Sequence, residues 1–302
     1  MNDLQELKKA LDLAGAGSIL HQPEIDAVLA EIIERNNPLR QNLPRKPGSG
    51  SAYIFNRRTA RGGAQFVNDT EEPSEQQSTV DQLSFPYRSI LYRGKVTRRL
   101  QKQGKSLLDI EAEEIESGLQ SVRDREEEAL LVGDAAANPK QFSGLRKLVP
   151  AGQTVEAGAN GGQLSLKLLD EAIDKVIGNP NMLLMTKAMH RKLNSLLQAQ
   201  QRFMDTVEVK GGFRLQAYQS IPIYRTIWQP TSEVQGTAND TQSLYVLEAG
   251  PEVFVSVLTE ITMERLAKTS SQGSSFDIYE DQSLVIKNEL KAARLKGLQA
   301  PN

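Results

Sequence analysis

The sequence predicts an α+β fold in which one long helix lies on a small sheet beside a compact α/β region. Three observations support this prediction. Apolar residues recur every three or four positions between residues 108 and 129, which is the period of a helix. Apolar and polar residues alternate over residues 51–100 and over much of 253–298, which is the period of a strand. Between these segments, residues 133–251 mix helical periods with short apolar runs, which is typical of a compact α/β region.

The composition limits the class of protein. The 302 residues suit one elaborate domain or two ordinary ones, and a hydrophobic fraction of 39% allows a modest core. The absence of cysteine excludes disulfides and thiolate metal sites. A net charge of −2 gives no bulk attraction to nucleic acid or membrane, and no apolar run approaches the ~18 residues of a membrane span. The acidic residues among the first 14 positions are not typical of a secretory signal. We therefore expect a soluble protein made in the cytoplasm, with no membrane partner.

Residues 1–50 are predicted to form an N-terminal arm. Two short amphipathic segments, at 4–11 and 25–32, precede a proline-rich stretch at 36–47 that carries Arg40 and Arg45 but no acid. Prolines without a regular period favour an extended strap that packs little against itself. Such a strap either crosses a neighbouring subunit or serves as a linker, and we favour the neighbour.

Residues 51–100 are predicted to form a protruding hairpin. Two strands with a two-residue period begin near Ala52 and Leu83, and the second continues through Tyr92. The segment between them is too polar to bury and too long for a tight turn. Because an isolated hairpin is at best marginally stable in water, this one needs a partner surface.

The long helix is predicted over residues 106–133. Ser106 is placed to cap it, Asp109 to complete a capping box, and Gly133 to end it. Its apolar stripe is thin, because Glu126 occupies a position where an apolar residue is expected and Gly118 leaves a gap. We expect the helix to pack on something thin, either a small sheet or a neighbouring subunit. The alternative is a solvated surface helix.

Charge is divided sharply around the start of this helix. Residues 82–108 contain seven bases and no acid, whereas residues 109–128 contain nine acids and two bases. One interpretation pairs Arg98 and Arg99 of one copy with the acidic helix of another, including Glu126 and Glu127. The alternative is two solvated faces of opposite charge within one subunit.

The remaining elements follow from periodicity and caps. The central region is predicted to hold helices at 164–177 and 187–200, the latter capped by Thr186, and strands at 182–185, 206–209, 221–227 and 244–247. Residues 229–242 are predicted to be a turn-rich excursion. The C-terminal region is predicted to form strands at 253–258, 261–266, 276–279 and 283–298. We expect the last of these to pair with 260–266 in a sheet that supports the long helix.

Catalytic chemistry has no support in the sequence. The only histidines, His21 and His190, are both expected to be solvated. No metal-binding or phosphate-binding motif occurs, so no metal, cofactor or catalytic residue is predicted. An enzyme that works through carboxylates alone is the alternative of a different class, and it would require a monomer or small oligomer with a defined pocket.

The order of these parts resembles the major capsid protein of tailed bacteriophages, whose fold is shared with encapsulins. The passages that resemble the family are GDAAANPKQFSGL, NPNMLLMTKAMHRKLNSL, GFRLQAYQSIPIYRT and SFDIYEDQSLVIKNELKAARL. The resemblance implies four parts. These are an N-terminal arm at 1–50, an E-loop hairpin at 51–100, a P-domain at 101–132 with 252–302, and an axial A-domain at 133–251.

The resemblance also implies a function. It is that of a non-enzymatic structural protein that self-assembles into hexamers and pentamers of an icosahedral capsid, which encloses double-stranded DNA in the virion. An encapsulin-type compartment with a protein cargo is the alternative. The implied partners are other copies of the chain, a portal, decoration proteins, and DNA held without sequence-specific contacts. Some relatives carry a cleaved scaffolding domain ahead of the arm. Only residues 1–50 precede the hairpin here, so we expect scaffolding to be a separate protein or unnecessary.

The chain departs from the family in the chemistry of its joints. Some relatives crosslink through a lysine in the hairpin loop and an asparagine of a neighbour, but residues 51–94 contain no lysine. We therefore expect every joint between subunits to be non-covalent. The predicted joints are added strands at hairpin edges and hydrophobic anchors, namely Phe55, Phe66, Phe85 and Tyr87.

Overall fold

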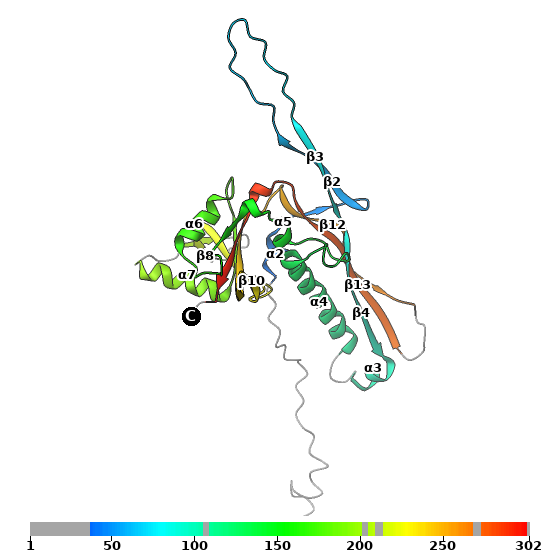
Figure 1. The fold of residues 1–302 in the computed structure, drawn as a ribbon. Coiled ribbons are helices and arrows are strands. Elements are labelled where there is room, and N and C mark those ends of the chain that lie inside the picture. The colour runs from blue at the N-terminus through cyan, green and yellow to red at the C-terminus, as the bar shows by residue number, and fades with distance from the viewer. Residues whose placement is uncertain (1–36, 105–108, 201–204, 209–213, 268–272, 301–302) are drawn as a thin grey trace, which may run out of the picture.

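The computed structural model describes residues 37–104, 109–200, 205–208, 214–267 and 273–300. Figure 1 shows three parts: a body built on a large sheet, a long helix lying along a second sheet, and a hairpin that projects away from both. The mixture of helices and strands confirms the predicted α+β class. Within these described residues, no helix is long and apolar enough to cross a membrane.

The long helix, α4 (Ile110–Val132), begins later than predicted. Asp109 is its N-cap, and a carboxylate oxygen of Asp109 accepts a hydrogen bond from the backbone N–H of Ala112 at 3.4 Å. The expected cap, Ser106, lies outside the described residues. Gly133 ends the helix as predicted, and its N–H donates to the carbonyl oxygen of Ala129 at 2.9 Å.

Helix α4 lies on a four-stranded sheet, as the sequence predicts. Its side chains Ile115, Leu119 and Val122 pack in one apolar cluster with Phe276 and Ile278 of the sheet. The thin stripe is therefore sufficient, because it faces a narrow sheet and not a broad core.

Gly118 allows the helix to approach this sheet closely. A Cβ atom at Gly118 would lie 2.6 Å from Cδ1 of Tyr92 and 2.8 Å from Cδ1 of Ile278. Carbon atoms do not pack this closely, so a side chain here would push α4 away from the sheet.

The four-stranded sheet has the order β1-β12-β13-β4. Strand β12 is continuous where two strands were predicted, with register shifts between Val257 and Thr262. Strand β1 is parallel to β12, and the other pairs are antiparallel. The four strands are β1 (Arg45–Pro47), β12 (Val253–Arg265), β13 (Gly273–Ile286) and β4 (Arg88–Thr97).

The last strand, β14 (Ala292–Gln299), pairs with other strands than the sequence predicted. Residues 283–298 were expected to pair with 260–266, but only β13 pairs with β12. The chain then passes through the short helix η3 (Glu289–Lys291), and β14 pairs with strands of the larger sheet. The C-terminal segment therefore connects the two sheets.

The larger sheet has eight strands in the order β5-β14-β11-β6-β9-β8-β7, with β10 paired to β11. Its main buried cluster joins residues of α6 and α7 to β6, β9, β11 and β14. The strands are β5 (Thr154–Glu156), β6 (Met182–Thr186), β7 (Asp205–Glu208), β8 (Arg214–Tyr218), β9 (Ile221–Thr226), β10 (Glu233–Gln235) and β11 (Ala238–Leu247), with β14.

Several short elements of this body were not predicted. Strand β8 was missed, and β10 lies within the segment that was expected to be all turn. The helices α5 (Leu145–Leu148) and η2 (Ala151–Gln153) were also missed. These elements are only three to five residues long, and such lengths show no clear period.

Both amphipathic segments of the body form helices, as the sequence predicts. Helix α6 (Leu166–Asp174) is shorter than expected and is capped by the side chain of Ser165. Helix α7 (Lys187–Ala199) is capped by Thr186 as predicted, because the hydroxyl oxygen of Thr186 accepts from the N–H of Met189 at 3.3 Å.

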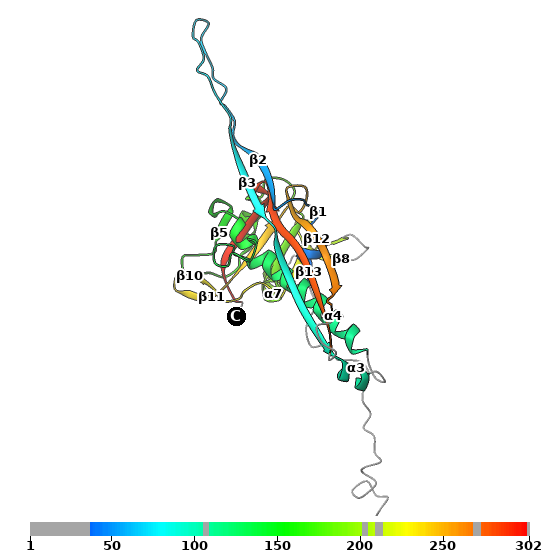
Figure 2. The ribbon, with the colours of Figure 1, turned by 90° about the vertical axis from the view of Figure 1, so that its right-hand side faces the viewer.

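The hairpin consists of β2 (Ala52–Ala60) and β3 (Thr79–Pro86), and both views show it extending away from the body (Figures 1 and 2). The second predicted strand is in fact two strands. After Tyr87, β4 pairs with β13 over ten residues and becomes part of the four-stranded sheet. The projecting part therefore ends at Pro86.

The described part of the arm packs on its own subunit, which is contrary to the predicted strap across a neighbour. Helix α2 (Pro38–Asn42) contacts α4, and β1 extends the four-stranded sheet. Leu39 and Leu43 are buried in one cluster with Leu130 of α4 and Val255 of β12. The rest of the predicted arm, residues 1–36, lies outside the described residues.

Candidate subunit interface

The hairpin is anchored to the body at its base by aromatic rings. Tyr53 lies opposite Phe85 in the register of β2 and β3. The ring of Tyr53 meets the ring of Phe254 edge-on at 5.5 Å, and the rings of Phe55 and Phe85 stack at 6.0 Å. Phe254 belongs to β12, so these contacts join the hairpin to the four-stranded sheet.

Charged side chains from the loop after β13 strengthen the same junction. The ammonium group of Lys287 lies 5.2 Å from the ring centre of Tyr53 and 5.5 Å from that of Phe254. The guanidinium of Arg57 pairs with the carboxylate of Glu289 at 2.6 Å. Beyond this base every residue from 58 to 82 is exposed, so the distal hairpin presents both faces to solvent.

The four predicted aromatic anchors occupy different environments. Phe66, near the tip, is fully exposed, while Phe55 and Phe85 are half-buried at the base. Tyr87 is buried, and its hydroxyl lies 2.9 Å from the hydroxyl of Ser256, with which it shares a hydrogen bond. Because Tyr87 is enclosed by its own subunit, its prediction as a contact to a neighbour was wrong. Contacts through the other three stay predictions.

The four predicted charged contacts also divide into two groups. Arg98 and Arg99 are exposed at the start of α3 (Arg98–Gly104), where another molecule can reach them. Glu126 and Glu127 are completely buried in their own subunit. Their prediction as contacts between subunits was therefore wrong, because the folded arm covers them.

Glu126 belongs to a buried cluster of four charges. Its carboxylate accepts a hydrogen bond from Nη1 of Arg45 at 2.7 Å and also pairs with Arg40. Both arginines pair with Glu280 of β13, with Nη1 of Arg40 at 3.0 Å from Oε2. Two guanidinium groups from the arm thus neutralise two buried carboxylates, one from α4 and one from the sheet.

Glu127 fastens the arm through the backbone. Its carboxylate oxygens accept hydrogen bonds from the N–H groups of Leu39 at 2.8 Å and Arg40 at 2.9 Å, in the first turn of α2. Burial raises the pKa of Glu127 to about 7, although the two backbone N–H groups and Arg40 oppose that shift. The attachment of α2 therefore depends on a group that titrates near neutral pH.

Part of the predicted charge division is used inside the subunit. Arg93 makes a two-point contact with Asp277, at 2.6 Å from each carboxylate oxygen, and the hydrogen bond from Arg93 lowers the pKa of Asp277. The hydroxyl of Tyr92 donates to Glu114 at 2.6 Å, and this hydrogen bond raises the pKa of Tyr92 to about 12. Both contacts join β4 to the adjacent acidic elements. Contacts of this region with another subunit stay predictions.

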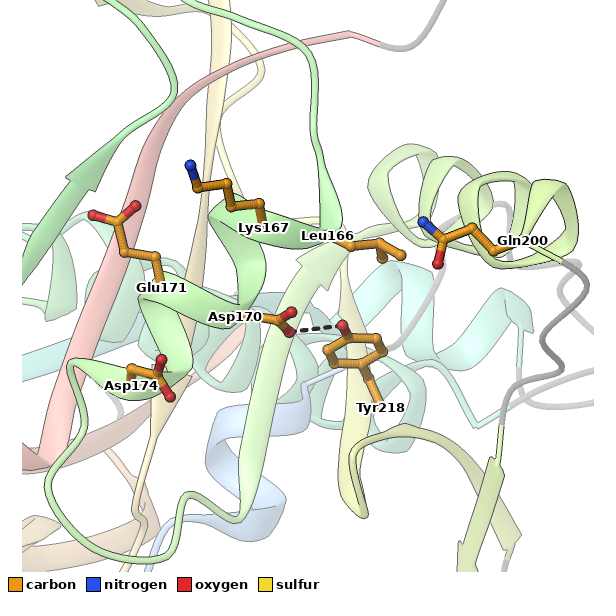
Figure 3. A pocket seen from close by; sticks show the side chains of 7 residues that line it. All are labelled: Leu166, Lys167, Asp170, Glu171, Asp174, Gln200 and Tyr218. Carbon is orange, nitrogen blue, oxygen red and sulfur yellow. Dashed lines mark hydrogen bonds between the residues drawn. The ribbon is translucent and has the colours of Figure 1, made fainter.

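The body carries an open pocket of about 500 Å³ between α6 and β8 (Figure 3). Its polar centre is Asp170, which accepts a hydrogen bond from the hydroxyl of Tyr218 at 2.7 Å and another from the amide of Gln219 at 3.0 Å. Glu171 and Asp174 line the same pocket. In Figure 3 the carboxylate of Glu171 points away from the pair formed by Asp170 and Tyr218, so the tyrosine hydroxyl engages Asp170 and not Glu171.

The prediction that both histidines are solvated was wrong for His190. His190 is buried and not solvated, and burial together with the charge of Arg225 lowers its pKa. His21 lies outside the described residues. Among the residues with described positions, no group of three or more histidine and carboxylate side chains is arranged to hold a metal ion.

The residues that fasten the arm and the hairpin were not identified from the sequence. A signal for the arm was present, because Glu126 interrupts an apolar stripe and Arg40 and Arg45 occur in a stretch without acids. A carboxylate at a core position requires a buried cation, and these arginines were candidates. No comparable signal marked Lys287, whose role depends on three rings brought together by folding.

A comparison with models of protein families supports the fold. The model described as "Phage capsid family" matches residues 17–214 of this chain. No curated protein sequence matches the chain.

Solved structures of similar fold include an encapsulin, a cyanophage capsid and a protein of a mycobacteriophage. The SrpI encapsulin of Synechococcus elongatus PCC 7942 aligns with a TM-score of 0.74 and 15% identity, over 95% of this chain and 96% of its own. The capsid of cyanophage A-1(L) aligns with a TM-score of 0.72 and 12% identity, over 93% and 98%. A protein of Mycobacterium phage Bobi aligns with a TM-score of 0.69 and 12% identity, over 97% and 99%. At these identities the comparisons establish the fold, over nearly the whole length of each chain.

Proposed function

The chain belongs to the phage capsid family, and on this premise we propose that it is the major capsid protein of a tailed bacteriophage. Many copies would assemble as hexamers and pentamers into an icosahedral shell that encloses double-stranded DNA. The protein would act as a structural component of the virion and not as an enzyme.

The observation that supports assembly most directly is the distal hairpin. Its two strands carry the exposed apolar side chains Ile54 and Val80, and the segment that joins the strands carries the fully exposed Phe66. A two-stranded hairpin is marginal in water without a further packing surface, and its outer edges hold unpaired backbone groups. A neighbouring subunit would supply both the packing surface and the missing strand contacts.

The division into four parts supports the same proposal. We propose an arm at 1–50, a hairpin at 51–100, a P-domain at 101–132 with 252–302, and an A-domain at 133–251. Two boundaries shift with the sheet topology, since β4 pairs within the sheet under α4 and β14 pairs within the larger sheet. The P-domain would then include residues 88–97, and the A-domain would include residues 292–299.

The exposed basic residues at the start of α3 form a second proposed contact. We propose that Arg98 and Arg99 meet an acidic surface of a neighbouring subunit. Each exposed pair contributes only ~0–1 kcal/mol, but a closed shell repeats the contact in every copy. Reversing both charges should reduce the yield of particles, and 1 M salt should do the same because the screening length falls to ~3 Å. Assembly that is insensitive to both changes would exclude this contact.

Particle formation and particle contents together test the proposed function. The full-length chain should sediment as uniform shells and not as a monomer, and electron microscopy should show closed particles. Particles from infected cells should hold double-stranded DNA that resists added nuclease. A monomer or small oligomer at high protein concentration would contradict the proposal and favour the carboxylate-only enzyme instead.

An encapsulin-type compartment is the second candidate, and the similarity to the SrpI encapsulin supports it. This candidate predicts the same shells with different contents. Particles that contain one stoichiometric cargo protein and no nuclease-resistant DNA would favour the compartment over the virion.

A further inference from the structure

A second cavity, of about 520 Å³, lies where the base of the hairpin meets the loop that follows β13. Strand β2 supplies one wall, which includes Phe55 and Arg57, and the loop after β13 supplies the other, which includes Lys287 and Asn288. We call this cavity the hairpin-base pocket. Because its two walls belong to the hairpin and to the body, a molecule bound in the pocket would contact both.

The two-residue period of β2 determines which side chains form the first wall. Tyr53, Phe55 and Arg57 alternate with exposed residues along the strand, so they face the same side. The ammonium group of Lys287 lies 5.2 Å from the ring centre of Tyr53 and 5.6 Å from that of Phe55. Lys287 and Arg57 therefore lie over the same face of β2, and both line the pocket.

These two cations have hydrogen-bonding capacity that the subunit does not use. The Nε atom of Arg57 is buried and makes no hydrogen bond within the described residues, although Nη1 pairs with Glu289. Lys287 lies among three aromatic rings, and no carboxylate in the described part of the chain forms an ion pair with its ammonium group. A ring attracts a cation but offers no lone pair to its N–H groups. Since a buried donor without an acceptor is unfavourable, both groups favour an oxygen acceptor from outside the subunit.

The two acids that line the pocket do not supply this acceptor. Glu289 pairs with Nη1 of Arg57 at 2.6 Å, and Glu252 accepts a hydrogen bond from Nδ2 of Asn288 at 3.2 Å. With Arg58, the lining holds three bases against these two acids, so it keeps a net positive charge. The pocket is therefore suited to a negatively charged ligand.

We propose that the hairpin-base pocket binds a phosphate group, held by the guanidinium of Arg57 from the hairpin and by the ammonium of Lys287 from the body. A phosphate suits the pocket better than a carboxylate does. Its oxygens point in several directions and can accept from both walls, whereas a planar carboxylate is matched by a single guanidinium. This site is separate from the proposed shell-forming function, because all of its residues belong to one subunit.

A phosphate bound between the two walls would brace the hairpin against the body. Because the ligand contacts both parts, binding should reduce the local opening of the hairpin base, and by linkage a fixed hairpin should bind phosphate more tightly. Backbone amide hydrogens of β2 and β3 near Phe55 and Phe85 should then exchange more slowly in phosphate than in chloride.

Titration of the full-length protein with inorganic phosphate tests the site. Heat of binding is measured by calorimetry at high protein concentration, with sodium chloride at the same ionic strength as the control for screening. An ion this small should bind weakly, with a Kd on the order of 1 mM. A nucleoside monophosphate is titrated in parallel. Tighter binding of the nucleotide would assign the bound phosphate group to a larger molecule, and equal or weaker binding would assign it to the free ion.

Two substitutions test the proposed contacts. Arg57→Lys keeps the charge and removes the Nε–H donor, whereas Lys287→Met keeps an unbranched side chain and removes the charge. The matched control is Arg61→Lys, the same change at an exposed hairpin position outside the pocket. Each pocket variant should weaken phosphate binding about tenfold or more, because that is the effect of losing a hydrogen bond to a charged group. The melting temperature of each variant is recorded, and Arg57→Lys, as the milder change, carries the test if Lys287→Met does not fold.

The expected result is saturable phosphate binding that both pocket variants weaken and the control does not, together with slower amide exchange at the hairpin base. Absence of saturable binding up to about 20 mM phosphate would overturn the site. Equal binding by Arg57→Lys, Lys287→Met and Arg61→Lys would place the ion elsewhere and would also overturn it. Either of these failures would leave the proposed function intact, since particle formation is measured separately.

Discussion

The buried charge cluster makes a quantitative prediction for Arg45→Met. This change removes the guanidinium that lies 2.7 Å from the carboxylate of Glu126 and also pairs with Glu280. Both carboxylates are 0% exposed and would then share Arg40 alone. Removing one partner of a buried ion pair costs ~3–5 kcal/mol. Because Arg40 remains, we expect the lower end of that range, about 3 kcal/mol.

The control for this prediction is Arg93→Met. Arg93 pairs with Asp277 at 2.6 Å in the same sheet, but its side chain is 61% exposed. Water screens an exposed pair, so removing Arg93 should cost far less stability than removing Arg45. The two variants lose the same kind of side chain, so the difference between them isolates the effect of burial.

The assay uses the single tryptophan of the chain. The indole N–H of Trp228 donates to the side-chain oxygen of Asn37 at 3.1 Å, so its fluorescence should report detachment of the arm. Urea unfolding of unassembled subunits is followed by Trp228 fluorescence and, separately, by circular dichroism. In Arg45→Met the fluorescence transition should move to lower urea than in Arg93→Met, and it should precede the loss of secondary structure. Equal urea midpoints for Arg45→Met and Arg93→Met at pH 8 would refute the assignment of the cluster as the fastening of the arm.

Four further predictions follow from single sites and from composition. Gly118→Ala should destabilise the subunit by about 1 kcal/mol in thermal melts. Overpacking against Tyr92 costs ~1–3 kcal/mol, and the higher helix propensity of alanine offsets about 1 kcal/mol of that cost. Ser121→Ala, on the exposed face of α4, is the control and should be nearly neutral. The folded-state pKa of Glu127 lies above its ordinary value of 4.5, so subunit stability should fall as pH rises from about 4.5 to about 7. Glu127→Gln should flatten this dependence of stability on pH. An unchanged dependence in the variant would contradict the assignment of the effect to Glu127. Phe66→Ala should leave the subunit melting temperature unchanged, since the ring is fully exposed, but should lower the temperature at which particles disrupt. Mature particles boiled in SDS should run as a single band near 33.4 kDa, because the hairpin lacks lysine and the chain lacks cysteine; a ladder of multimers would disprove this.

The sequence by itself indicated the long helices and strands and their order along the chain. The helical period of residues 110–132, the cap at Thr186 and the two-residue alternation of the hairpin are local signals, and each produced the predicted element. Such signals are readable because neighbours in sequence are neighbours on the same face of a helix or strand. The resemblance to phage capsid proteins depended on the same order of elements.

Only the tertiary structure decided which surfaces the subunit uses internally. Glu126 and Glu127 looked like surface acids in an acidic helix, but the arm covers them with Arg40 and with backbone N–H groups. Tyr87 continued the aromatic alternation of the hairpin, yet it is buried beside Ser256. These contacts join residues more than eighty positions apart, so no local pattern contains them.

The sheet membership of β14 was also decided by tertiary structure. Its alternation was read correctly as a strand, but alternation does not specify the partner of a strand. The turn at Asn288 and η3 directs β14 to β11, where it completes the core of the larger sheet. Strand pairing depends on the free energy of burying both apolar faces in the whole fold, and that free energy is a property of the assembled sheets and not of any one segment.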